Sequence, residues 1–104
     1  MERKIKNIEL DGEEFLSIEL NKDDLGLIHS GDLKSLVNEQ ISKKNSKIIF
    51  DFVNIDNINS SGLGVLISCL KTIKDKNGKF KLVNVNDKIK KIFTITKLNL
   101  VFDL

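Results

Sequence analysis

The feature that most constrains how this chain can fold is a short, almost continuously apolar segment near its middle, Lys47–Val53, with the sequence Lys-Ile-Ile-Phe-Asp-Phe-Val. Such a run is typical of a central strand that is covered on both faces. Amphipathic helix patterns lie on either side of it, over Gly31–Lys43 and over Ser60–Lys76. A strand between two helices pairs in parallel with its neighbours through right-handed crossovers. The middle of the chain therefore predicts an α/β fold.

The beginning of the chain predicts an antiparallel hairpin. Apolar and polar residues alternate over Lys4–Leu10 and again over Glu14–Leu20, and Asp11-Gly12 lies between the two runs. Asp-Gly between alternating runs is a strong hairpin signal. The alternation slips at Asn7-Ile8, which predicts a bulged or frayed first strand.

The second half of the chain predicts further units of the same sheet. A strand is expected at Lys79–Val85, a third helix after a cap at Asn86 or Asp87, and a closing strand at Leu100–Leu104. The helix expected over Ser60–Lys76 has a predicted apolar face, which consists of Leu63, Leu66, Ile67, Leu70 and Ile73. The order β-β-α-β-α-β-α-β predicts a mixed sheet, in which an N-terminal antiparallel hairpin precedes parallel βαβ units, flanked by helices.

Composition excludes several classes of function. The formal net charge is +2, Arg3 is the only arginine, and tyrosine and tryptophan are absent, which disfavours nucleic-acid binding. A single cysteine, Cys69, and a single histidine, His29, disfavour a disulfide framework and a clustered metal site. No apolar run approaches the ~20 residues of a membrane-spanning helix, and the N-terminus does not resemble a signal peptide. We therefore expect one cytoplasmic domain over residues 1–104, without membrane insertion, metal or cofactor.

One segment, Asn59–Leu66, departs from the local rules of helix formation. Its sequence, Asn-Ser-Ser-Gly-Leu-Gly-Val-Leu, places two glycines at the start of a helix, each costing about 1 kcal/mol relative to alanine. In a purely structural interpretation, Ser60 caps the helix and the glycines permit close packing on the sheet. In a functional interpretation, the segment lies at the carboxyl edge of the sheet, where open α/β folds place their sites. A helix N-terminus attracts negative charge, so a serine there can carry a phosphate, and glycines leave room for a partner's backbone.

Other known glycine or serine motifs do not fit this segment. Gly62-Leu63-Gly64 lacks the spacing and the Lys-Ser/Thr pair of a P-loop, and it lacks the third glycine of a dinucleotide fingerprint. A serine hydrolase requires a histidine base, and His29 lies in a separate loop. Because no acid–base or nucleophile–base pair can be assembled, we do not expect an enzyme.

The stretch from the central strand into this helix, Asn54–Leu66, resembles the signature of STAS domains, specifically of bacterial anti-sigma factor antagonists. Asp51 and Ile58 stand where that family commonly has a strand aspartate and a hydrophobic residue before the motif. Asn77–Val85 is similar to its glycine turn and fourth strand, and Ile89–Leu98 to its third helix. The resemblance covers most of the chain and implies a STAS-like form of the mixed sheet.

The resemblance implies a partner switch. In such families the unphosphorylated antagonist binds an anti-sigma factor that is also a serine kinase, and this frees the sigma factor. The kinase then phosphorylates the first serine of the motif, here Ser60, the complex dissociates, and a PP2C-type phosphatase removes the phosphate. The residues implied to contact the partner are Asn59, Ser60, Ser61, Gly62, Leu63, Gly64, Asp23 and Asp24.

Three features of the chain depart from the family pattern. Asn59 stands where the family usually has aspartate, and Asn21–Ser30 lacks the usual Gly-x-Leu/Ile-Asp opening. The sequence ends at Leu104, without the additional C-terminal helix of many relatives. The first and third departures favour an alternative role, a structural STAS subunit of a signalling scaffold or lipid-transport complex in which Ser60 is never phosphorylated.

Overall fold

The computed structural model describes residues 4–22, 24–25 and 30–102. Its elements in chain order are β1 (Ile5–Leu10), β2 (Glu13–Glu19), α1 (Ser30–Ser42), β3 (Lys47–Asp51), α2 (Ser60–Asp75), β4 (Lys79–Val83), α3 (Asp87–Ile95) and α4 (Leu98–Val101). These bounds confirm the predicted hairpin, the central strand and the three predicted helices.

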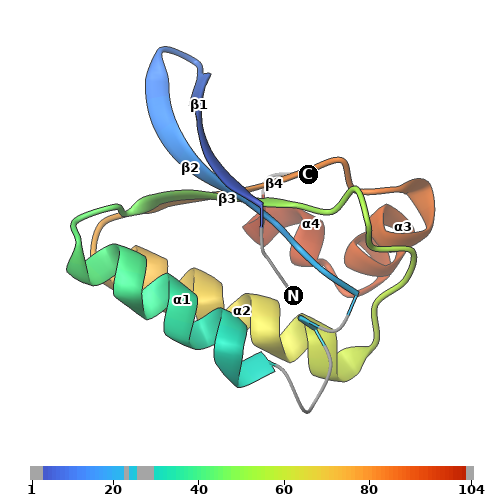
Figure 1. Cartoon of the computed structure of the whole chain (residues 1–104). Helices are drawn as coiled ribbons and strands as arrows, with labels where there is room; N and C mark the ends of the chain where they lie inside the picture. The colour runs from blue at the N-terminus through green and yellow to red at the C-terminus, as the bar shows by residue number, and fades with distance from the viewer. Residues whose placement is uncertain (1–3, 23, 26–29, 103–104) are drawn as a thin grey trace.

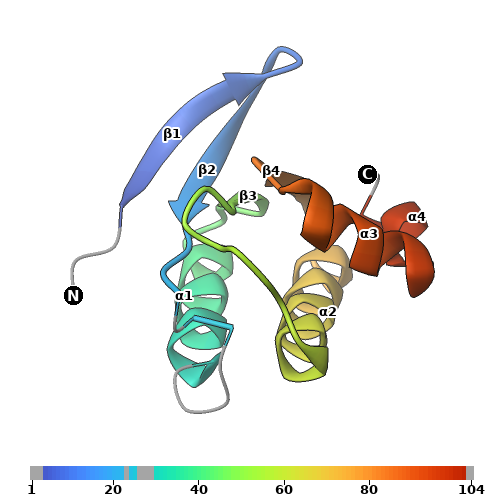
Figure 2. The ribbon, with the colours of Figure 1, turned by 90° about the vertical axis from the view of Figure 1, so that its right-hand side faces the viewer.

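The strands form one mixed sheet with the order β1-β2-β3-β4. β1 pairs with β2 antiparallel, whereas β2, β3 and β4 are parallel, as the strand and helix pattern predicted. Each parallel crossover steps to the next strand in the same direction, so right-handed crossovers place their helices on the same face. Figures 1 and 2 show α1 and α2 side by side beneath the sheet, with α3 and α4 beyond its β4 edge.

The hairpin turn is formed by Asp11 and Gly12, with φ angles of 53° and 79°. Positive φ at both central residues is what a two-residue type I′ turn requires. The strand pairing then runs without interruption from Leu10 opposite Glu13 to Ile5 opposite Ile18. The predicted bulge or fraying of β1 is therefore wrong, because the tight turn sets a regular register despite the irregular apolar pattern.

Glu13 ties the hairpin to the neighbouring strands. Its carboxylate lies 2.6 Å from Nζ of Lys79 on β4 and 3.5 Å from Nζ of Lys47 on β3. The hydrogen bond from Lys79 holds the pKa of Glu13 below its usual range. These contacts hold the turn end of the hairpin, next to Asp11 and Gly12, to β3 and β4. The hairpin rises out of the plane of the sheet in Figure 1.

The main core lies between the sheet and the helices. Phe50 of β3 and Phe80 of β4 are neighbours on the helix-covered face, with ring centroids 4.7 Å apart in an edge-to-face arrangement. On the opposite face, Phe15 and Ile49 are also buried. The central strand is thus covered on both sides, as its continuous apolar sequence predicted.

Helix α2 presents a slightly different face to the core from the one predicted. Its buried residues are Gly62, Val65, Leu66, Cys69, Leu70 and Ile73. The prediction was wrong for Ile67, which is 43% exposed, and Leu63 is only partly buried. Two overlapping apolar stripes are present in this helix, and the buried one begins at Gly62, which packs closely against Ile58 and Leu25. Burial raises the pKa of the Cys69 thiol to about 11, so the thiol stays protonated at neutral pH and serves as a packing group.

The predicted closing strand at Leu100–Leu104 is wrong over residues 100–102, and residues 103–104 lie outside the described residues. Lys97 adopts a left-handed conformation with φ of 62°, and the chain then forms the short helix α4. Phe102 follows it, 3% exposed, with its ring 5.9 Å from that of Phe80 and 5.5 Å from that of Phe93. A helical turn brings this aromatic ring into the core, so the sheet has four strands within the part of the chain that is described.

Candidate functional site

The loop between β3 and α2 is anchored by two apolar side chains. Ile55 and Ile58 are both buried in the core, whereas Asp56, Asn57 and Asn59 between and after them are exposed. The backbone N–H of Ile55 donates to the carbonyl of Phe52 at 2.9 Å, which turns the chain directly after the strand. The motif is therefore held on the surface by hydrophobic contacts beneath it.

Asn59 is the N-cap of α2. It has an extended backbone, and its Oδ1 accepts a 2.9 Å hydrogen bond from the N–H of Gly62. Its carbonyl accepts the first helical bond, from the N–H of Leu63 at 3.0 Å. The structural interpretation of Ser60 as the cap is therefore wrong, because the asparagine before it already performs this role. Asparagine and aspartate cap helices about equally well, so the departure from the family's aspartate leaves the cap intact.

Ser60 is consequently the first residue of the helix, and its side chain is exposed. Ser61 follows it and is partly buried. Within the described part of the chain, the backbone N–H groups of Ser60 and Ser61 have no hydrogen-bond acceptor. Unpaired amides together with the helix dipole favour a negative charge at this position. The site thus combines an accessible hydroxyl with a local preference for an anion.

The two glycines of the motif have different structural roles. A methyl group at position 62 would lie 2.7 Å from Cγ1 of Ile58 and 3.3 Å from Cβ of Leu25. At position 64, a methyl group would meet no atom within 4 Å in the described part of the chain. Gly62 therefore permits close packing of the β3–α2 loop and of the segment before α1. Gly64 has no such internal constraint and leaves an open surface beside Ser60.

This contrast predicts opposite effects of two alanine substitutions. Gly62→Ala is expected to lower the free energy of unfolding by about 1–2 kcal/mol, because overpacking outweighs the gain in helix propensity. Gly64→Ala is expected to raise it by up to about 1 kcal/mol. Urea unfolding of the two variants beside the wild type measures both changes. If Gly62→Ala stabilised the protein as much as Gly64→Ala, the close packing at position 62 would be irrelevant.

Polar side chains from the connection between β4 and α3 hold the loop in place. The Nδ2 group of Asn86 donates to the carbonyls of Ile55 and Asp56 at 3.2 and 3.0 Å. The Oδ1 of the same residue accepts from the N–H of Ile89 and caps α3. The sequence offered Asn86 or Asp87 as the cap, and the structure selects Asn86. The contact of Asn86 with the loop was missed, because no local signal marks a partner about 30 residues away.

Asp51 acts in a similar way at the end of β3. Its Oδ1 accepts hydrogen bonds from the N–H of Val53 at 3.0 Å and from Nδ2 of Asn84 at 2.9 Å. The strand aspartate that the resemblance singled out therefore joins the exits of two parallel strands. It positions the loop that leads to Ser60 and lies outside the motif itself.

The loop before α1 approaches the motif through Leu25, as the Gly62 geometry shows. Asp24, predicted as a partner contact, is buried, and its Oδ2 accepts a 2.7 Å hydrogen bond from the N–H of Asn21. The carboxylate thus stabilises its own turn, and its role as a partner contact stays a prediction. Asp23 and His29 lie outside the described residues.

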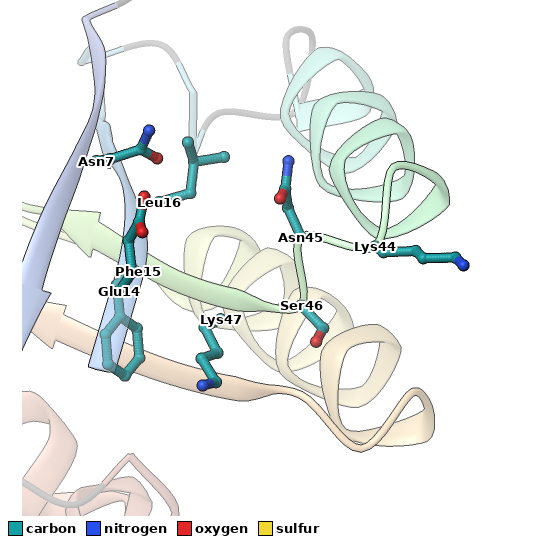
Figure 3. A pocket seen from close by; sticks show the side chains of 8 residues that line it. All are labelled: Asn7, Glu14, Phe15, Leu16, Lys44, Asn45, Ser46 and Lys47. Atoms are coloured by element: carbon teal, nitrogen blue, oxygen red, sulfur yellow. The ribbon is translucent and has the colours of Figure 1, made fainter. Parts of the chain in front are cut away.

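Of several cavities in the described part of the chain, a small one lies beside the motif and a larger one lies far from it. The small cavity, about 170 Å³, is lined by Lys22, Ile55, Asp56 and Asn57. The larger cavity, about 330 Å³, lies at the opposite end of β3 and is lined by Asn7, Glu14, Phe15, Leu16, Lys44, Asn45, Ser46 and Lys47 (Figure 3). None of the predicted site residues lines either cavity. Among the described residues there is no group of three or more His, Cys, Asp or Glu side chains arranged to hold a metal ion.

The chain is similar to a known protein family and to two curated proteins. The profile of the STAS domain matches residues 4–104. A Thermotoga maritima protein with the provisional name anti-sigma factor antagonist is 32% identical over 66 residues, and a Thermotoga neapolitana homologue of TM1081 is 30% identical over the same length. Each match covers 64% of this chain and 58% of the relative, so the matched region spans little more than half of those proteins.

Solved structures show the same fold. The NMR structure of the protein TM1081 has a TM-score of 0.76 at 25% identity and covers 97% of this chain and 79% of that one. The crystal structure of the T. maritima protein has a TM-score of 0.70 at 24% identity, covering 93% and 81% of the two chains. The phosphorylated form of the Bacillus cell fate determinant SpoIIAA has a TM-score of 0.63 at 19% identity, and the match covers 93% of this chain and 86% of that one.

In the described part of this chain, no helix is long and apolar enough to cross a membrane.

Proposed function

This chain belongs to the STAS domain family, and from that premise we propose that it is an anti-sigma factor antagonist switched by phosphorylation of Ser60. In its unphosphorylated form it binds an anti-sigma factor that is also a serine kinase, and this releases the sigma factor. It acts as a binding module without catalysis of its own. The kinase and a PP2C-type phosphatase are its transient modifying partners.

The observation that carries this proposal is the position of Ser60. It is an exposed hydroxyl at the first residue of α2, next to backbone amides that have no acceptor among the described residues. In the transfer step, the Ser60 oxygen attacks the γ-phosphorus of ATP on the kinase, the hydroxyl proton passes to a base of the kinase, and ADP leaves. The phosphate group on Ser60 adds a charge of about −1.5 to −2 at neutral pH.

The same charge has opposite effects inside and outside the domain. Within the domain, the helix N-terminus stabilises it, so the fold tolerates the modification. At a partner surface packed against α2, the new charge must be desolvated or must face like charges, and both weaken the complex. Asn59 caps the helix without placing a carboxylate beside the phosphate.

Mass spectrometry of the protein recovered from its native cells tests the proposal. We expect a fraction that carries one additional phosphate, mapped to Ser60, whose abundance changes with growth conditions. Ser60→Ala is expected to abolish the added mass and Ser61→Ala to retain it. A modified fraction that maps to Ser61, or an unmodified mass under every growth condition, would contradict the switch.

A second candidate function is supported by Asn59, which stands where the family usually has aspartate. In this alternative, the chain is a permanent structural subunit of a signalling scaffold or lipid-transport complex. Such a subunit is expected to co-purify with its partners irrespective of kinase and ATP. Release of the partner on addition of ATP would exclude this alternative.

A further inference from the structure

One exposed surface is not used by the proposed switch: the side of α3 that faces away from the core, together with α4. Ile89 and Phe93 turn the inner side of α3 toward the core, and both are fully buried. Lys88, Lys91 and Ile95 are exposed and follow the spacing i, i+3, i+7, which places them in one stripe along the helix. The stripe therefore begins with cations and ends with an apolar side chain.

The apolar end of this stripe continues into α4. Ile95 is 72% exposed, Leu100 is 78% exposed and Val101 is 52% exposed. A side chain that lines a groove is partly covered by the groove walls, so these high values describe side chains that protrude. We call this surface the α3–α4 tip and define it as Lys88, Lys91, Ile95, Lys97, Leu100 and Val101. Figure 2 shows α3 and α4 at a corner of the molecule, beyond the β4 edge of the sheet.

The tip is basic: three of its six residues are lysines and none is acidic. The segment around it, residues 86–104, contains four lysines and two aspartates, a net charge of +2, which equals the formal net charge of the whole chain. Among the described residues, the ion pairs of this protein involve Lys43, Lys47, Lys79 and Lys81, and none involves the lysines of α3 or Lys97. The cations of the tip are therefore available to an external anionic partner.

We propose that the α3–α4 tip binds reversibly to an anionic lipid surface. Protruding aliphatic side chains can enter the boundary between headgroups and acyl chains, while lysines next to them remain at the level of the anionic headgroups. This inference goes beyond the proposed switch, which uses the N-terminus of α2. It concerns attachment to the membrane surface, with no segment crossing it.

Two other occupants fit these observations less well. A second copy of the chain would place one basic tip against another, and like charges at an interface are unfavourable. A protein partner is typically bound through aromatic residues, methionine and arginine, and lysine is depleted at such interfaces. The tip consists of lysines and aliphatic side chains, and it protrudes, which suits a deformable lipid surface better than a preformed protein groove.

Flotation of the full chain with large unilamellar vesicles tests the proposal. We expect binding to vesicles of phosphatidylglycerol and phosphatidylcholine at low ionic strength, little binding to pure phosphatidylcholine, and weaker binding as salt rises. The double variant Lys88→Gln/Lys91→Gln is expected to lower the partition coefficient about 25-fold, from about fivefold for each lysine. Leu100→Ser/Val101→Ser is expected to lower it at least as strongly, because it removes the inserted apolar surface.

Matched variants elsewhere on the molecule serve as controls. Ile67→Ser removes an apolar side chain that is exposed on α2, and Lys43→Gln removes an exposed lysine at the end of α1; neither is expected to change vesicle binding. All variants should keep the wild-type circular dichroism spectrum, because every replaced side chain is exposed. Absence of binding to anionic vesicles would overturn the proposal, as would equal binding to neutral vesicles.

Analytical ultracentrifugation of the protein in the absence of lipid tests the alternative that the tip binds a second copy of the chain. A concentration-dependent dimer that is lost in Leu100→Ser/Val101→Ser would assign the tip to a second copy of the chain and overturn the lipid proposal. Ser60 is unchanged in all these variants. Their phosphorylation state therefore reports on the proposed switch separately from membrane attachment.

Discussion

Replacing Ser60 with aspartate is expected to weaken binding to the anti-sigma factor by at least about 30-fold, whereas Ser60→Ala should bind as tightly as the unphosphorylated wild type. The expected loss corresponds to about 2 kcal/mol or more for a charge placed without compensation in a desolvated interface. Alanine removes the hydroxyl but adds no charge. Calorimetric titration of the purified variants with anti-sigma factors from the same cells measures the difference.

The fold itself is expected to tolerate both substitutions. Ser60 is exposed, and aspartate in the first turn of a helix is stabilising by about 0.3–1 kcal/mol. Ser60→Asp should therefore unfold at the same temperature as the wild type or slightly above it. An unchanged unfolding temperature would show that weaker binding by Ser60→Asp does not result from a loss of structure. Equal affinity of the aspartate and alanine variants for the partner would contradict the charge switch.

Phe102→Ala is expected to destabilise the protein by about 3–5 kcal/mol, the largest effect on stability that we predict. Phe102 is buried, and its ring packs edge-on against Phe80 and is stacked with Phe93. Alanine would leave a cavity at the junction of β4, α3 and α4. For a domain with a total stability of about 5–15 kcal/mol, such a loss places the protein close to unfolding at ambient temperature. Urea unfolding followed by circular dichroism measures it.

Leu100→Ala is the matched control for this prediction. Leu100 lies two residues earlier in the same segment and is 78% exposed, so its truncation should change the stability by less than about 0.5 kcal/mol. In a strand, by contrast, residues 100 and 102 would point to the same face and be buried or exposed together. Similar losses from both substitutions would therefore contradict the helical turn and support the strand that the sequence suggested.

The α2 motif shows how far local reasoning extends at the candidate site. Its position between a central strand and a helix, and its accessible serine, were predictable because both depend on neighbouring residues. The identity of the cap was not resolved, since Asn59 and Ser60 are both favourable cap residues and only the backbone geometry distinguishes them. The distinction between Gly62 and Gly64 was also not predictable. It depends on where Ile58 and Leu25 pack against the helix.

The sequence by itself determined the order of the elements from β1 to α3, the hairpin and most helix boundaries, because apolar periodicity, Asp11-Gly12 and residues that favour helix caps act over a few residues. Only the tertiary structure decided which stripe of α2 is buried, that Asn86 holds the loop before Ser60, and that Phe102 enters the core from a helical turn. Each of these depends on contacts between segments that are distant in the chain. A local pattern can show that a side chain prefers to be buried, but its partner is determined by how the sheet and helices pack together.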